Sequence, residues 1–423
     1  FKQKTAYEIM PSLVGSEMCI RDRLNYLFYA LIGCFLGIIT GLTPGIHVNT
    51  VAIMGLSIFP RLSISPIEFA VIMVGMAVTH TFLDFIPSIF LGVPEEETAL
   101  SVLPTHQLLI QGRAIEAVKL TAYGSLFGLF FALIFLLPAL FLIPVIYKNL
   151  HPFILYILII CIIILILRER EFRKIFYASI VFLLSGILGI FMFKQRILST
   201  TEVLFPVFVG IFGLSNILFS LKSKSTEIVP QEDFITIGMD RDLLSSTFIG
   251  SIGGLIVGIL PAMSPSQVGV IMYEIMGTNI RNFILSVSAI NTSDAIYSFV
   301  SLYTINNPRS GVATIIGKVM SINLNTLLLL VGVTSFIAFI ATFLHIKIGR
   351  IAMRFVERIN YGFLSFLSLM FVLVLVLYFT GLFGLYMAIL STVIGTIPIL
   401  SSISRTHCMG VLIVPTILYF LGC

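Results

Sequence analysis

The sequence carries little charge for its length. Only 11% of its 423 residues are Asp, Glu, Lys or Arg, whereas 58% are hydrophobic. A soluble core does not need so much apolar sequence, and here it falls in long runs. The formal net charge of +5 is small and is spread over short loops, so binding to nucleic acid is not expected. The composition therefore predicts an all-α polytopic protein embedded in a lipid bilayer.

Cysteine pairs and enzyme motifs are also lacking. The five cysteines are scattered singly, without a C-x-x-C or a Cys/His cluster, so neither a disulfide framework, a metal site nor a cofactor is predicted. The sequence contains no H-E-x-x-H, no G-x-G-D and no paired Asp-rich motif, and its six histidines are dispersed. We therefore expect no enzyme. An intramembrane enzyme stays an alternative, as does a channel, which would usually show a filter loop repeated around an oligomeric axis.

The first 23 residues are unlike the rest of the chain. The stretch 13–22, LVGSEMCIRD, is the translation of a DNA string that resembles a sequencing-library transposon adapter. The stretch 2–8, KQKTAYE, resembles the matching flow-cell adapter. A polar tail or a signal peptide is the rival interpretation, but no apolar core of adequate length precedes a cleavage site. We expect residues 1–23 to be a read-through artefact, extended or isolated from the bundle, with the true N-terminus missing.

From Leu24 onward, apolar runs alternate with short basic or Pro/Gly breaks. The polar stretch 222–242 separates a first transmembrane repeat with connecting helices, 24–221, from a second repeat with C-terminal helices, 243–423. We expect roughly 10–12 membrane segments. Runs of about 14 residues are too short to cross alone and suit half-helices or re-entrant hairpins. The runs lie at 24–43, 46–59, 67–92, 118–147, 151–167, 175–193, 203–221, 243–260, 264–277, 282–304, 312–344, 364–379, 381–400 and 409–422.

One feature occurs twice, 217 positions apart. A glycine-spaced apolar helix runs into a proline, and small polar residues follow. A proline inside a helix removes a backbone hydrogen bond, so each copy predicts a helix broken within the membrane. Bare backbone is tolerated there only where protein or a water-filled cavity covers it. We expect the two prolines to approach each other near the bilayer midplane. The copies are Gly33, Gly37, Gly41, Pro44 and Gly250, Gly254, Gly258, Pro261.

Lysine and arginine indicate how the two halves are oriented. The basic clusters at 168–174 and 347–358 are expected on the cytoplasmic side. The run 118–147 then ends outside, whereas its counterpart 312–344 ends inside. Equivalent helices that end on opposite sides indicate two inverted repeats, although Lys194 and Arg196 fall outside and argue mildly against this. Paired broken helices in two halves are typical of a secondary transporter with its site at the break.

Several motifs resemble one family. The segment 91–117, LGVPEEETALSVLPTHQLLIQGRAIEA, and the Gly37–Gly45 motif resemble the large permease subunit of tripartite tricarboxylate transporters, the TctA family. The matching positions are Gly92, Pro94, Leu103, Pro104, Gln111 to Ala114, Ala117, Phe205, Pro206 and Gly210 to Gly213. The resemblance implies symport of a small organic anion, expected to be a carboxylate, with Na⁺ or H⁺ through a prokaryotic inner membrane. It also implies a small membrane subunit and an extracytoplasmic binding protein as partners, and a homodimer is a further candidate.

The chain departs from that family's pattern where it has the acidic run 95–97 and Ala262. Three acids near the site would repel a tricarboxylate, which leaves a non-carboxylate solute open. Transport without the two partner proteins also stays open.

Candidate site residues cluster at the breaks and beside two intramembrane aspartates. Half-helix N-termini suit anions and freed carbonyls suit cations, although the polar residues after each proline could merely satisfy backbone groups at a kink. Intramembrane carboxylates indicate function, and neutral oxygens beside them suit a hard cation. Glu95 is either a site residue or a first-turn acid favoured by the helix dipole. The candidates are Pro44, Gly45, His47, Asn49, Thr50, Thr81, Asp84, Glu95, Pro261, Ser264, Ser266, Asn291, Thr292 and Asp294, with Asp84 and Asp294 expected to carry ion coupling.

Overall fold

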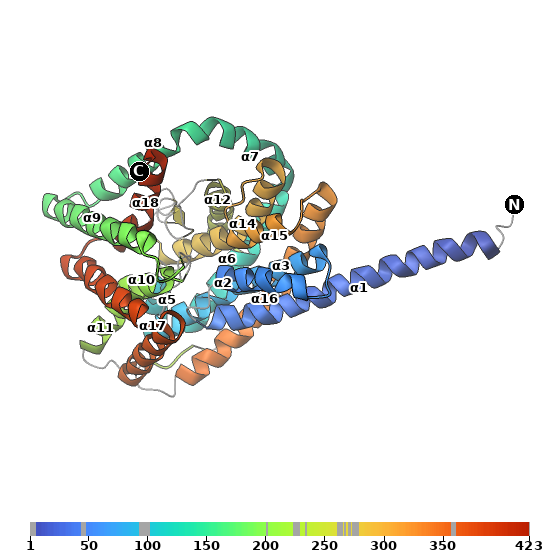
Figure 1. Ribbon diagram of the computed structural model, residues 1–423. Coiled ribbons are helices and arrows are strands. Elements are labelled where there is room, and N and C mark those ends of the chain that lie inside the picture. Colours follow the sequence, from blue (N-terminus) through green and yellow to red (C-terminus); the bar gives the residue numbers. More distant parts are fainter. Residues whose placement is uncertain are drawn as a thin grey trace.

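The computed structural model describes the backbone of residues 6–43, 48–92, 102–199, 202–222, 229–232, 235–259, 265, 268–269, 272, 279–356 and 361–422. Along these residues the chain forms helices and no strand (Figure 1). Eight helical stretches among them are long and apolar enough to cross a membrane, and two shorter apolar helices accompany them. The predicted all-α polytopic architecture is confirmed.

The helices of the first half begin with α1 and end with α11 before the polar linker. They are α1 (Ala6–Leu42), α2 (Val48–Ile58), η1 (Phe59–Arg61), α3 (Pro66–Leu83), α4 (Phe85–Leu91), α5 (Val102–Ile110), α6 (Ala114–Ile134), α7 (Leu136–Leu150), η2 (His151–Phe153), α8 (Ile154–Leu167), α9 (Phe172–Lys194), α10 (Leu204–Phe208), the π-helix η3 (Val209–Leu214) and α11 (Ser215–Lys222).

The second half begins with α12. It contains α12 (Arg241–Val257), α14 (Ile280–Ile305), α15 (Gly311–Val319), α16 (Leu324–Val356), α17 (Tyr361–Ser401), η4 (Arg405–Met409) and α18 (Gly410–Leu421). Of an 18-residue apolar window in each of the spans 66–91 and 280–305, 89% of the residues are buried, whereas in the span 136–167 the share is only 11%. The helices α3, α4 and α14 therefore form the centre of the protein, screened from lipid by the others.

Glycines set the closest helix contacts, in the same way in both halves. In the first half, Gly33, Gly37 and Gly41 of α1 lie against the backbone of α3. In the second half, Gly250 and Gly254 of α12 and Gly258 at its C-cap lie against α14 in the same order. Small residues four apart let two helix backbones approach closely, so the repeated glycine spacing builds the same helix pair twice.

The helix α3 has sharp local signals at both ends. At its start, Ser65 caps the helix in a capping box with Glu68, and Pro66 occupies the first turn. At its end, Asp84 separates α3 from α4. Because Pro87 has no N–H, the carbonyl of Leu83 loses its helical partner, which explains why the helix breaks here.

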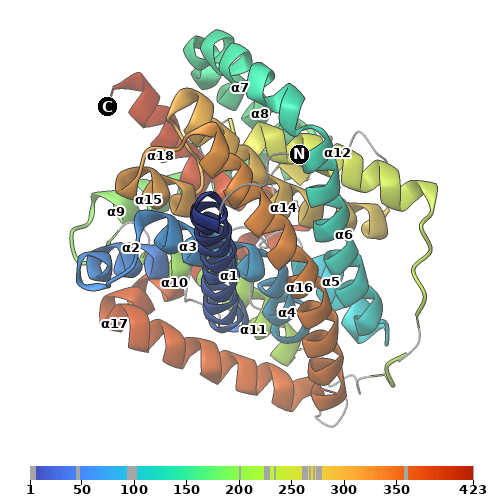
Figure 2. The same cartoon turned by 90° about the vertical axis from the view of Figure 1, so that its right-hand side faces the viewer.

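The packing of α6 and α16 supports the inverted arrangement of the halves. These helices are neighbours, with Val118 against Gly349 and Thr121 hydrogen-bonded to His345 at 2.9 Å. The residue numbers of the contacts fall along α16 as they rise along α6, so the two helices are antiparallel. Each also packs on the central helix of the other half, α6 on α14 and α16 on α3 (Figure 2). Such an exchange is expected from a pseudo-two-fold axis perpendicular to the helices.

Two predicted runs were wrong as single segments. The run 118–147 divides at Phe135 into α6 and α7, where Pro138 removes a helical hydrogen bond. The run 312–344 divides into α15 and α16, because Asn323 accepts a hydrogen bond from the backbone N–H of Thr326 at 2.9 Å and so begins a new helix. The helix α16 also continues to Val356, so Lys347, Arg350 and Arg354 of the basic cluster lie on its final turns, where Lys and Arg suit the helix dipole.

The predicted boundary between 379 and 381 is reproduced within α17. Gly381 has φ 64° and ψ −163°, a conformation that favours glycine, and it bends α17 into two arms. The stretch 6–23 continues α1 as a helix that projects away from the remaining helices (Figure 1). It is therefore isolated rather than extended, while its origin as an artefact stays a prediction.

Candidate functional site

Seven of the predicted site residues lie outside the described residues: Pro44, Gly45, His47, Glu95, Pro261, Ser264 and Ser266. The expected approach of the two prolines lies outside them as well. Thr50 falls in the first turn of α2, and its side chain is also outside the description. The residues that precede each break are described, and their contacts show which side chains lie near the break.

Asp84 is buried where the two halves meet. Its side chain is 2% exposed, and it lies level with Gly41 near the end of α1. Nδ2 of Asn291 on α14 donates to Oδ2 of Asp84 at 3.3 Å and approaches the carbonyl oxygen of Thr81 at 3.5 Å. A buried carboxylate is retained only with polar partners or an ion. The sequence candidates Thr81, Asp84 and Asn291 are therefore brought together, across 207 positions of sequence.

Asp294 lies beside the end of α12. Its Oδ1 accepts a hydrogen bond from Oγ of Ser298 at 3.4 Å, and Oγ of Ser298 accepts one from the backbone N–H of Ser310 at 3.2 Å. A β-carbon added at Gly258 would lie 3.3 Å from the same Oδ1. Asn291, Asp294 and Ser298 are spaced to share one face of α14. That face therefore carries polar groups from the Asp84 contact to the start of α15.

The two aspartates are not strict repeat equivalents. The spacing of 217 residues that relates the glycines maps Asp84 onto Ser301 and Asp294 onto Ala77. Ser301 donates a hydrogen bond to the carbonyl oxygen of Gly258 at 3.1 Å. In each half, therefore, a polar side chain, Asp84 or Ser301, lies beside the end of the helix that carries the glycines. When the second half is aligned on the first by this shift, Asp84 and the position that corresponds to Asp294 are about two helical turns apart. Their partners must therefore differ.

The side chains of Asn49, Thr81 and Thr292 are also placed by the structure. Asn49 lies against Gly311, so the start of α2 in one half meets the start of α15 in the other. The hydroxyl of Thr81 donates to the carbonyl of Val78 at 2.9 Å, so only its backbone oxygen faces Asn291. The hydroxyl of Thr292 is buried without a hydrogen-bond partner among the described residues. Thr292 is rotated by about 100° from Asn291 around the helix, so it belongs to another face.

A cation that the sequence analysis missed lies at the second break. Nε of Arg309 donates to the carbonyl oxygen of Ile259 at 3.2 Å, just beyond the end of α12. Its guanidinium is 6.0 Å from the ring centroid of Tyr147. Burial lowers the pKa of Arg309, but a guanidinium keeps its charge because its ordinary pKa is so high. The sequence feature that could have identified Arg309 is its position, because it is the single Lys or Arg between Arg281 and Lys318.

The histidines near the site have structural contacts. Nδ1 of His80 is 3.1 Å from the hydroxyl of Thr40, and Nδ1 of His106 is 2.8 Å from the carbonyl oxygen of Ile89. Among the described residues, no group of three or more His, Cys, Asp or Glu side chains could hold a metal ion. The arrangement therefore offers two carboxylates, neutral oxygens and the guanidinium of Arg309 around helix ends, a set of groups that suits reversible binding of small ions.

The sequence matches the tripartite tricarboxylate transporter TctA family over residues 27–410. It is 32% identical over 407 residues to the uncharacterized protein MJ1079 of Methanocaldococcus jannaschii, covering 93% of this chain and 99% of that protein. It is 24% identical over 250 residues to an uncharacterized 52.8 kDa protein in the TAR-I ttuC' 3'region of Agrobacterium vitis, covering 56% of this chain and 49% of that one. No solved structure matches.

Proposed function

This chain belongs to the tripartite tricarboxylate transporter TctA family, and from that premise we propose that it is a secondary active transporter. It carries a small organic anion, a carboxylate, across a prokaryotic cell membrane in symport with Na⁺ or H⁺. The observation that carries the proposal is the contact between Asp84 and Asn291, a buried carboxylate held between the central helices of the two halves. Two inverted repeats that meet at a polar site can move against each other, so that the site opens to one side of the membrane and then to the other.

The coupling cation binds at the carboxylates. Asp84 is almost fully buried, and a charge inside the membrane is costly unless a partner or an ion balances it. Binding of a cation at Asp84 therefore lowers the free energy of the state in which this site is closed to water on both sides of the membrane. The carbonyl of Thr81 supplies a neutral oxygen of the kind that a hard cation prefers. Asp294, beside the end of α12, supplies a second carboxylate on the same face of α14.

The organic anion binds nearer to the second break. Arg309 supplies a positive charge there, and guanidinium groups pair with carboxylates through two parallel hydrogen bonds. The first turn of α15, capped by Ser310, adds the positive end of a helix dipole on the same side. Arg309 and Asp294 both lie at the end of α12, so a bound anion and a bound cation would be neighbours and would favour each other.

Partner proteins are part of the proposal. The family takes its name from tripartite systems, so a small membrane subunit and an extracytoplasmic binding protein are candidate partners. Co-purification of tagged protein from its native host, with and without the organic anion, tests this. A chain that transports at full rate alone in liposomes needs neither partner.

Uptake by purified protein in proteoliposomes tests the proposed function. Labelled mono-, di- and tricarboxylates are supplied with an imposed Na⁺ gradient, an imposed proton gradient or neither. We expect one class of carboxylate to accumulate above its external concentration with one of the gradients. Flux that only equilibrates the anion under every gradient would indicate a channel, and chemical conversion of the solute would indicate an enzyme.

A further inference from the structure

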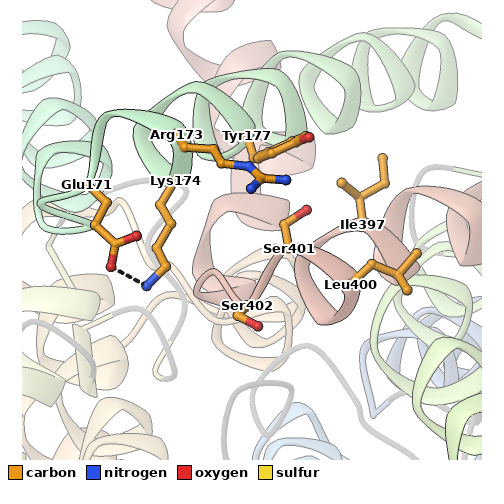
Figure 3. Close-up of a pocket in the computed structure, with 8 residues that line it drawn as sticks. All are labelled: Glu171, Arg173, Lys174, Tyr177, Ile397, Leu400, Ser401 and Ser402. Atoms are coloured by element: carbon orange, nitrogen blue, oxygen red, sulfur yellow. Dashed lines mark hydrogen bonds and ion pairs between the residues drawn. The ribbon is translucent and has the colours of Figure 1, made fainter.

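A separate pocket lies far from the helix breaks in sequence, between the start of α9 and the end of α17 (Figure 3). Its volume is about 680 Å³. It is lined by two cations, one acid, two serines, a tyrosine and two aliphatic side chains: Glu171, Arg173, Lys174, Tyr177, Ile397, Leu400, Ser401 and Ser402. None of these residues belongs to the proposed transport site.

The charges in the pocket are not balanced. Nζ of Lys174 pairs with Oε1 of Glu171 at 2.8 Å. Arg173 forms no ion pair with any residue that the structure describes, and its guanidinium lies 5.9 Å from the ring centroid of Tyr177. Ser401 and Ser402 place two hydroxyls on the opposite wall (Figure 3). The pocket therefore offers a net positive charge and several hydrogen-bond donors, which is the chemistry that recognises a phosphate group.

The walls of the pocket are tied together beneath it. Oε1 of Glu169, in the loop before α9, accepts a hydrogen bond from the backbone N–H of Ser404 at 2.7 Å and lies 2.9 Å from Nε2 of His407. Both partners follow α17 in the chain. The side chain of His407 is 1% exposed and that of Glu169 is 12% exposed, so the link is sheltered from water. The two walls are therefore held at a fixed separation.

The surroundings of the pocket select a lipid. Both helices that form it are long enough to cross a membrane, so the pocket lies at helix ends near the membrane surface. Phe172 is 87% exposed and Leu400 is 72% exposed, as expected for side chains that contact acyl chains. Basic pockets between membrane helices bind anionic lipid head groups. We propose that this pocket binds the phosphate head group of an anionic phospholipid, whose acyl chains lie along Ile397 and Leu400.

The chain itself provides a clean reporter for this lipid, because it contains no tryptophan. Tyr177→Trp introduces a single fluorophore in the pocket and keeps an aromatic ring beneath Arg173. Tyr378→Trp, at a position that is 79% exposed on α17, places the reporter outside the pocket. The protein is reconstituted in phosphatidylcholine nanodiscs that contain a small fraction of either brominated phosphatidylglycerol or brominated phosphatidylcholine, and bromine quenching is compared.

We expect phosphatidylglycerol to quench the reporter of Tyr177→Trp several-fold more than phosphatidylcholine does, and the reporter of Tyr378→Trp equally with both. Adding Arg173→Gln and Lys174→Gln should weaken the preference by roughly fivefold for each charge removed. The matched control, Lys194→Gln with Arg196→Gln, removes two charges from the far end of α9 and should leave the preference intact. Thermal unfolding in phosphatidylcholine alone checks that the variants fold.

Two results would overturn the proposal. One is an equal preference for phosphatidylglycerol in the Arg173→Gln, Lys174→Gln variant and its control. The other is loss of the lipid signal on addition of millimolar inorganic phosphate, which would indicate a site for a free anion rather than for a lipid. Neither result depends on transport, so the lipid site and the proposed function can fail separately.

Discussion

The two helix breaks share a frame but differ in chemistry. In both, three glycines spaced by four bring a broken helix against a central helix, α1 against α3 and α12 against α14. The first break carries a buried carboxylate, Asp84, which is bonded to the other half. The second carries a guanidinium, Arg309, which binds the carbonyl beyond the end of α12. A common backbone therefore presents a negative group in one half and a positive group in the other.

This difference indicates how a repeated fold becomes a directional device. Two identical halves would offer the same ligand two identical sites. Here the carboxylate of Asp84 in the first half suits a cation and the guanidinium of Arg309 in the second half suits an anion, while Asp294 on α14 adds a carboxylate beside the end of α12. Substitutions in each half should therefore change different steps of transport.

Asp84→Asn should have the largest effect. It keeps the size of the side chain but removes the charge that a coupling cation needs. We expect gradient-driven uptake in proteoliposomes to fall by roughly 100-fold, the factor for a lost coupling free energy of about 3 kcal/mol. Asp242→Asn, at an exposed acid in the first turn of α12, is the control and should transport normally. Normal coupling in Asp84→Asn would remove Asp84 from the mechanism.

Arg309→Gln should weaken substrate binding and leave the stoichiometry of coupling unchanged. A charge-assisted hydrogen bond contributes about 2 kcal/mol, which corresponds to roughly a 30-fold rise in the apparent KM. The control is Lys318→Gln, at an exposed cation on the same short helix, α15. Equal KM values for the two variants would place the anion elsewhere.

The glycine frame should respond to added bulk equally in the two halves. A β-carbon at Gly37 would lie 2.5 Å from Cβ of Thr79 and 2.6 Å from the carbonyl oxygen of Met76. Gly37→Ala and Gly254→Ala should each destabilise the fold by about 1–3 kcal/mol, as overpacking does. Gly332→Ala, whose β-carbon meets no atom within 4 Å, is the control. Thermal unfolding in detergent measures all three, and unchanged stability in the first two would contradict the close packing.

The smallest effect is expected at a buried pair in the second half. The hydroxyls of Ser251 and Tyr297 lie 3.2 Å apart, and the shift of 217 residues maps Tyr297 onto His80 of the first half. Tyr297→Phe removes this hydrogen bond and should reduce the free energy of unfolding by about 1 kcal/mol. Tyr303→Phe, at an exposed tyrosine of the same helix, should have no measurable effect. A larger loss of stability in Tyr303→Phe than in Tyr297→Phe would contradict a stabilising hydrogen bond between Ser251 and Tyr297.

The glycine frame and the bend near Gly381 were predictable because their signals are local. Glycines four apart and a glycine between two apolar runs can each be identified from a few neighbouring residues. The division of the run 312–344 was harder, since an apolar segment carries no periodic sign of a stop, and Asn323 acts only through its cap. The continuation of α16 through its basic cluster was missed because charge was taken as a loop signal, although Lys and Arg are good helix formers.

The site was only partly predictable because its contacts join distant residues. Asp84, Thr81 and Asn291 could be chosen by their polarity in apolar surroundings, but their contact arises from how the two halves pack. Thr292 was chosen by adjacency to Asn291, and helix rotation turns it to another face. Arg309 was missed because it stands in a Pro/Ser/Gly turn, where a cation looks like an ordinary boundary residue.

One ratio tests the proposed division, in which Asp84 at the first break carries ion coupling and Arg309 at the second break binds the organic anion. Gradient-driven uptake and gradient-free exchange of the same labelled carboxylate are measured in parallel for the wild type, Asp84→Asn and Arg309→Gln. We expect Asp84→Asn to lose uptake while exchange partly survives, so that the ratio falls. Arg309→Gln should weaken both through a higher KM, so that the ratio at saturating substrate is unchanged. The same ratio in both variants would contradict the division.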